Sequence, residues 1–108
     1  MERKYDSAVY QDISILDLIL FSIYFVISKK EVCTFERLVE ECFDLFPKRF
    51  SFEKNFKWPD SRKLDRSLRS LRKEELIKGS PQTSFILTKK GERIAVEISK
   101  SLRQKKLL

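Results

Sequence analysis

Apolar residues along this chain follow helical spacing in four segments, which polar or proline-containing stretches separate. The first segment, Ile13–Ser28, is apolar on nearly every face and is interrupted by Asp17. It starts with Ser14-x-x-Asp17, which resembles a capping box, so we predict a helix from Asp12 or Ser14 to Ser28. Because this helix is apolar almost all round, we expect its own domain to bury several faces and a second subunit to cover another.

A second helix is predicted from Phe35 to Phe46, where apolar residues recur at intervals of three and four. Thr34 is the expected N-cap, and Pro47 ends the helix because proline lacks the N–H that a helix interior needs. Before this helix, the segment Glu31-Val32-Cys33 is predicted to form a very short strand.

A third helix has a clear start at Trp58-Pro59-Asp60-Ser61, with Asp60 as the expected N-cap. Leu64, Leu68 and Leu71 form its apolar stripe, and we expect it to end near Leu76.

The chain after the third helix has the pattern of a small hairpin. Leu76–Lys78 and Ser84–Leu87 are predicted strands on either side of the loop Gly79–Thr83. Thr88 is expected to cap a last helix that runs to about Gln104. The predicted order is helix, short strand, helix, helix, hairpin, helix, which is a mainly α fold with a small β-hairpin, in the α+β class.

The length of 108 residues fits one domain, which we place at residues 12–108 after a loosely held, polar segment at residues 1–11. The segment Pro47–Pro59 fits no single element, because Phe50, Phe52, Phe56 and Trp58 alternate there with cations. Its aromatic residues either stack on unpaired bases or fill the core beneath a helix, and part of it can form a short helical turn.

Charge is distributed unevenly along the chain. Residues 1–46 carry five cations against nine acids, a net charge of −4, whereas residues 47–108 carry 18 cations against seven acids, a net charge of +11. Such asymmetry indicates a surface for a polyanion on one side of the protein. The alternative is an ordinary basic protein whose charge keeps it soluble.

The cations of the third helix gather on the face opposite its leucines. With Leu64 at zero and ~100° per residue, Leu68 and Leu71 fall within ~40° of it, and the four cations opposite fall between ~140° and ~200°. These four are Arg62, Arg66, Arg69 and Lys73, and Lys63 and Ser70 lie beside them. Asp65 and Glu74 fall on the flanks, where they can pair with neighbouring cations.

This arrangement suits a helix that enters the major groove of DNA. We expect Arg62 and Arg66 to contact base edges, since the N-terminal part of such a helix usually does, and Arg69 and Lys73 to contact phosphates. Lys78, Lys89 and Lys90 are further candidates from the hairpin and the start of the last helix. The alternative is a solvated helix face, although solvated faces usually mix charges of both signs. The pattern fits DNA and also RNA.

Two short motifs resemble the winged helix-turn-helix superfamily in its MarR-like and PadR-like branches. They are Leu76-Ile77, after the third helix, and Leu87-Thr88-Lys89-Lys90-Gly91, at the end of the hairpin. The resemblance implies a winged-helix fold with a recognition helix at residues 60–75, a wing at residues 79–84 and dimerisation through terminal helices. The connection between the second and third helices is longer than in a tight helix-turn-helix.

The composition makes several other classes of protein unexpected. With no histidine and only two cysteines, Cys33 and Cys42, the chain lacks the usual zinc ligands, and we expect no metal, no cofactor and free thiols in the cytoplasm. Glu40-Glu41 and Glu74-Glu75 are adjacent in sequence and diverge on a helix, so we expect no enzyme. Ile13–Ser28 is too short for a membrane span and contains an acid.

From the sequence we therefore expect a double-stranded-DNA-binding transcription regulator. It would act as a homodimer through Ile13–Ser28 and Thr88–Gln104. The alternative is a protein-interaction module with the same fold, for instance a small subunit of a larger complex, which the nearly all-apolar first helix favours.

Overall fold

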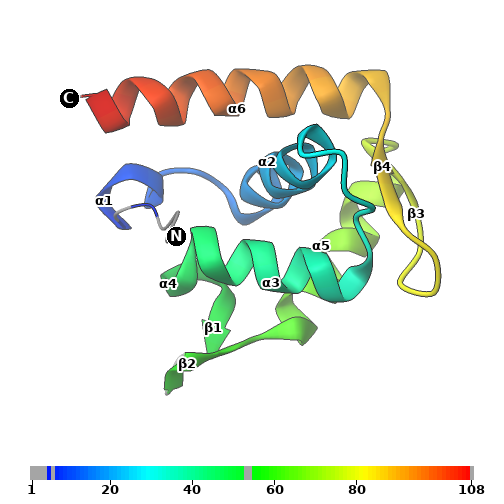
Figure 1. Cartoon of the computed structure of the whole chain (residues 1–108), viewed down its shortest axis with the longest axis horizontal. Helices are drawn as coiled ribbons and strands as arrows, with labels where there is room; N and C mark the ends of the chain where they lie inside the picture. Colours follow the sequence, from blue (N-terminus) through cyan, green and yellow to red (C-terminus); the bar gives the residue numbers. More distant parts are fainter. Residues whose placement is uncertain (1–4, 6, 53–54, 108) are drawn as a thin grey trace.

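Helices and two short hairpins alternate along the chain, as shown in Figure 1. The computed structural model describes residues 5, 7–52 and 55–107, and their side chains except those of residues 7, 52, 55–59 and 105–107. The helices are α1 (Ser7–Tyr10), α2 (Ile15–Ser28), α3 (Phe35–Leu45), α4 (Pro47–Phe50), α5 (Ser61–Lys73) and α6 (Lys89–Leu107). The strands are β1 (Ser51–Phe52), β2 (Asn55–Pro59), β3 (Ile77–Gly79) and β4 (Phe85–Leu87).

The α2 helix lies at the centre of the molecule, with α6 on one side and α3 on the other (Figure 1). It also contacts α5 and β4, so four elements bury it. Half of its residues are buried by the protein's own side chains, which explains why the segment is apolar on most faces. In the part of the chain that the structure describes, no helix has both the length and the hydropathy needed to cross a bilayer.

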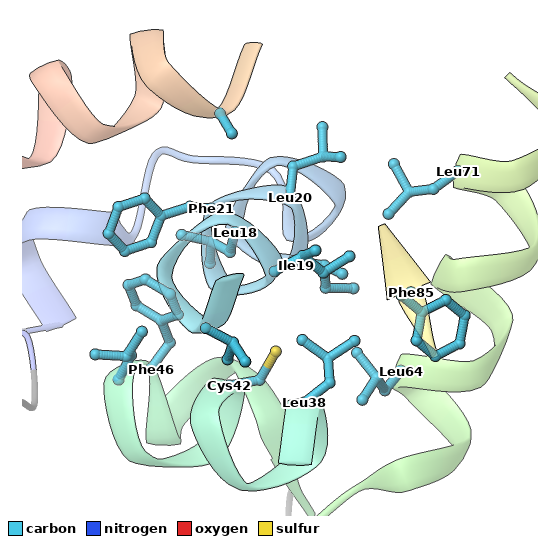
Figure 2. Close-up of a cluster of buried hydrophobic side chains, with 14 of the residues drawn as sticks. Leu18, Ile19, Leu20, Phe21, Leu38, Cys42, Phe46, Leu64, Leu71 and Phe85 are labelled. Atoms are coloured by element: carbon cyan, nitrogen blue, oxygen red, sulfur yellow. The ribbon is translucent and has the colours of Figure 1, made fainter. Parts of the chain in front are cut away.

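The core forms where the inner faces of α2, α3 and α5 meet. Figure 2 shows Leu18 and Ile19 of α2 beside Leu38 and Cys42 of α3, with Leu64 of α5 closing one side. These side chains are all almost completely buried. The predicted apolar stripes of the first three long helices therefore converge on one core.

Three of the four predicted N-caps, those of α2, α3 and α5, are confirmed by their hydrogen bonds. The Ser14 hydroxyl accepts a hydrogen bond from the Asp17 amide at 3.2 Å, and the Thr34 hydroxyl accepts one from the Arg37 amide at 3.2 Å. The Asp60 carboxylate accepts one from the Lys63 amide at 3.3 Å. Each cap satisfies a backbone donor that the first turn of a helix leaves unpaired, so the starts of α2, α3 and α5 follow from local sequence.

Two of the long helices end in the same way, with a non-glycine residue in the left-handed region. Lys30 after α2 has φ 62° and Glu75 after α5 has φ 61°. In each case the next amide bonds back to the carbonyl five residues earlier: Glu31 to Val26 at 3.4 Å, and Leu76 to Leu71 at 3.0 Å. This is the Schellman arrangement, which normally places glycine at the left-handed position.

The predicted hairpin is confirmed, with β3 and β4 antiparallel and Lys78 opposite Ile86. Gly79 belongs to β3 and has φ 115°, a value that favours glycine. A Cβ at this position would overlap the Ser84 carbonyl oxygen, so the hairpin closes only around a glycine. The α3, α5 and α6 helices begin at or next to their predicted starts, and α2 begins one residue after Ser14, the later of its two predicted starts.

The prediction of a strand at Glu31–Cys33 is wrong. The segment is irregular, and the Phe85 amide donates to the Cys33 carbonyl at 2.8 Å as its contact with the hairpin. One such bond does not make a ladder, because a strand needs several aligned donors and acceptors along its length.

The connection between α3 and α5 contains more structure than its sequence predicted. Pro47–Phe50 forms the short helical turn α4, in agreement with the prediction, but the β1–β2 hairpin that follows was not predicted. Phe50 is buried in the core, and its carbonyl accepts from the Asp60 amide at 2.6 Å. The side chains of Phe52, Phe56 and Trp58 lie outside the described residues.

The polar segment at residues 1–11 contributes two aromatic side chains to the fold. Tyr10 of α1 is buried, and its ring packs edge-on against Phe46 at 5.0 Å between centroids. Tyr5 stacks on the same Phe46 ring at 5.5 Å, and its amide donates to the Leu45 carbonyl at 3.0 Å. Tyr5 and Tyr10, two of the described residues of this segment, therefore contact the end of α3.

Candidate nucleic-acid interface

The α5 helix has one buried face and one exposed face, as its spacing predicts. Leu64, Leu68 and Leu71 are almost completely buried, and so is Ser67, whose hydroxyl donates to the Lys63 carbonyl at 2.9 Å. The exposed residues of the helix include three arginines, a lysine and two serines. They are Ser61, Arg62, Arg66, Arg69, Ser70 and Lys73. The predicted cationic face of α5, formed by Arg62, Arg66, Arg69 and Lys73, therefore points away from the core.

The cations of this face differ in whether an acid neutralises them. Among the described residues, Arg62, Arg66 and Lys73 have no carboxylate within 4.0 Å. Arg69 pairs with Asp65 at 3.1 Å, one helical turn away, as expected for an acid on the flank. Its side chain is still 71% exposed, so it can exchange this partner for a phosphate. The face thus carries a concentrated and largely uncompensated positive charge.

Of the two predicted site residues beside these cations, Lys63 is placed differently and Ser70 is exposed with them. Lys63 is half-buried, and its ammonium donates to the Arg49 carbonyl at 3.0 Å, which ties α5 to the end of α4. Ser70 is exposed, and its hydroxyl makes a long 3.5 Å contact with the Arg66 carbonyl. The sequence places Lys63 beside the cationic face, but its hydrogen bond directs it toward the protein.

The remaining candidates, Lys78, Lys89 and Lys90, are exposed on β3 and on the first turn of α6. Arg72, which sequence reasoning did not single out, helps hold β3 beside α5, because its guanidinium donates to the Gly79 carbonyl at 3.2 Å. The angular positions of residues around α5 gave no signal for this role of Arg72, because the carbonyl that it contacts belongs to Gly79, seven residues further along the chain.

The motif Leu87-Thr88-Lys89-Lys90-Gly91 has a structural role in joining α6 to the end of α5. The Thr88 hydroxyl donates to the Glu75 carbonyl at 2.8 Å and accepts from the Gly91 amide at 3.1 Å, which confirms Thr88 as a cap. A Cβ at Gly91 would overlap the Leu76 carbonyl oxygen. The threonine and the glycine of the motif therefore hold the start of α6 against the end of α5, and its two lysines remain exposed.

A shallow hollow of about 520 Å³ lies at the edge of the cationic face, between the start of α3 and the N-terminal half of α5. One aromatic ring and three guanidinium groups line it, together with a carboxylate and a hydroxyl. These residues are Phe35, Ser61, Arg62, Asp65, Arg66 and Arg69. Phe35 was expected only as a member of the apolar stripe of its helix, and its incomplete burial is visible only in the structure.

The chain matches no family model, no curated protein and no solved structure in our comparisons. The case for its function therefore rests on the geometry and charge of this surface.

Proposed function

We propose that this protein is a winged-helix protein that binds double-stranded DNA and regulates transcription as a homodimer. The observation that carries the proposal is the exposure of Arg62, Arg66 and Lys73 with no acidic partner among the residues that the structure describes, while the leucines of the same helix are buried. In the proposed fold, α5 is the recognition helix and the β3–β4 hairpin is the wing.

The dimensions of α5 support insertion into the major groove. A helix with its side chains is about 10–12 Å across, close to the ~12 Å width of the major groove of B-form DNA. Arg62 and Arg66 are one turn apart in the N-terminal half of the helix, where such helices contact base edges. Arg69 and Lys73 follow toward the C-terminal end and would neutralise phosphates.

Three lysines extend the positive surface beyond the helix. Lys78 on β3 and Lys89 and Lys90 on α6 are exposed, and Arg72 holds β3 beside α5. Side chains on neighbouring elements that contact phosphates fix the orientation of a protein on the duplex without reading its sequence. We assign these three lysines to phosphate contacts.

A groove of about 610 Å³ between the start of α2 and the middle of α6 is the proposed dimer contact. Ile13, Ile94 and Ile98 provide its apolar surface, and Asp12, Asp17 and Glu97 are among its polar residues. These acids disfavour DNA, and Arg93 also lines the groove, so in a two-fold dimer the arginine of each copy can pair with an acid of the other. A two-fold dimer would present two α5 helices to a pseudo-palindromic site.

Fluorescence anisotropy with a labelled duplex, selected from a random-sequence pool by the wild-type protein, tests the proposal. Affinity should fall linearly on a log–log plot against salt, with a slope of about −0.9 for each phosphate contact. Arg66→Ala should cost about 1–3 kcal/mol at the selected site if the side chain contacts a base.

The double variant Arg62→Ala/Arg66→Ala is compared with Lys30→Asn/Lys48→Ala, which removes the same charge from exposed positions outside α5 and outside the two helices proposed for the dimer contact. Loss of affinity in the α5 variant alone supports the proposed interface. Equal losses of affinity in the two variants would show that only net charge matters, and no binding to duplex DNA would refute the proposal.

Light scattering should give the mass of a dimer. A monomer that does not bind DNA and captures a specific protein would favour the alternative, a protein-interaction module.

A further inference from the structure

Phe35 lies at the edge of the cationic face, although it belongs to another helix. It occupies the first position of α3, and its ring lines the hollow that Arg62 and Arg66 line from α5. Its side chain is half-buried and packs against the edge of the core. Part of an aromatic ring thus faces the same open space as two arginines that have no acidic partner among the described residues.

The other residues of the hollow indicate what it can accept. Asp65 lines it as well, and its carboxylate is held 3.1 Å from the Arg69 guanidinium. The three arginines of the hollow outweigh this carboxylate, so the charge of the hollow attracts DNA in general and does not by itself select one group of the ligand. An apolar ring beside these charged groups adds a surface that only an apolar part of the ligand can use.

Double-stranded DNA presents one such apolar group to the major groove, the 5-methyl group of thymine. A methyl group needs only a small apolar surface, which a partly buried ring still offers, whereas stacking of an unpaired base requires an open ring face. The half-burial of Phe35 therefore favours the methyl contact over stacking.

We propose that Phe35 is a specificity-determining residue that contacts the 5-methyl group of a thymine next to the bases contacted by Arg62 and Arg66. This inference rests on the proposed function, because it requires α5 to lie in the major groove. It adds α3 to the surface that contacts DNA and makes thymine part of the preferred site.

The experiment replaces each thymine of the selected duplex, one at a time, by deoxyuridine, which removes only the methyl group. We expect one or two positions at which this change weakens binding of the wild-type protein about fourfold, the factor for burying one methyl-sized group. In Phe35→Ala the same replacement should have no effect. The control is Phe43→Ala, because Phe43 is a half-buried phenylalanine on the same helix that does not line the hollow. This variant should keep the fourfold difference in affinity between thymine and deoxyuridine.

Phe35→Tyr is the second variant, used if the alanine variant does not fold, since it keeps an aromatic ring at this position and adds a polar hydroxyl to it. This variant should show a smaller difference in affinity between the duplex with thymine and the duplex with deoxyuridine. A selected site without thymine, a wild-type protein that ignores every replacement, or a methyl preference unchanged in the Phe35 variants would each overturn the inference and leave the proposed function standing. Failure to bind any duplex would refute both.

Discussion

Glu41 offers the sharpest test of what holds the central helix in place. Its side chain is only 5% exposed, and its carboxylate pairs with Arg37 at 2.6 Å and with Lys29 at 3.4 Å. Lys29 is the C-cap of α2, so the buried carboxylate connects the end of that helix to α3. Glu41→Ala removes the acid that two cations share in a poorly solvated position.

The exposure of Arg37 and Lys29 sets the range expected for the loss in free energy of unfolding caused by Glu41→Ala. Removing one member of a fully buried ion pair costs about 3–5 kcal/mol, because the remaining charge loses its partner. The side chains of Arg37 and Lys29 keep 21% and 27% of their exposure, and Arg37 retains Glu31 at 3.1 Å. We therefore expect a loss of about 2–3 kcal/mol in the free energy of unfolding, below the fully buried case.

Urea unfolding followed by circular dichroism measures this loss, and Glu40→Ala is the matched control. Glu40 precedes Glu41 on α3 and pairs with the same arginine at 3.7 Å, but its side chain is 67% exposed. An exposed pair contributes about 0–1 kcal/mol, so the control should change stability little. Equal losses in the two variants would refute the argument that burial makes the Glu41 pair important.

Three further predictions concern stability and thiol chemistry. Lys30→Gly should raise the free energy of unfolding by up to about 1 kcal/mol in urea titrations, because φ is 62° at this helix end; a loss would contradict it. Burial, then Glu40 and Glu41, raises the pKa of Asp44 above its unfolded value, so ionised Asp44 costs stability at neutral pH and the cost disappears as pH falls through the folded pKa. Asp44→Asn should therefore raise the urea midpoint at pH ~7 but not at pH ~3, and an equal gain at both would exclude a charge effect. Burial raises the pKa of Cys33 to about 12 and also raises that of Cys42, so Ellman's reagent should label both thiols in urea and neither in the native protein.

The helices could be predicted because their signals are local. Ser14, Thr34 and Asp60 each cap a helix three residues before the amide that they accept from, a distance that the sequence displays directly. The exposed face of α5 was predictable for a similar reason, since one helical period assigns Leu64 and Arg66 to opposite sides.

The elements that were missed depend on partners far away in the sequence. Glu31–Cys33 was predicted as a strand, but its bond to the hairpin is the single one from the Phe85 amide to the Cys33 carbonyl. Tyr10 is buried because Phe46 lies beside it, and no local pattern shows that contact. No local pattern shows the position of Lys63 either, because its ammonium donates to the carbonyl of Arg49, a residue on another helix, and does not lie with the cationic face.

Burial of one face of α5 in the core determines how the helix is oriented about its axis, and this orientation also determines which residues form the candidate interface. Full burial stabilises each of Leu64, Leu68 and Leu71 by about 1.5–3 kcal/mol, so a turn that exposed them would cost far more than any exposed ion pair could recover. That packing fixes the direction of Arg62 and Arg66 before any ligand arrives. In the proposed function, the arginines of α5 act as a preformed surface because little reorganisation opposes binding, so substitutions beneath the helix should weaken the proposed DNA binding by misdirecting them.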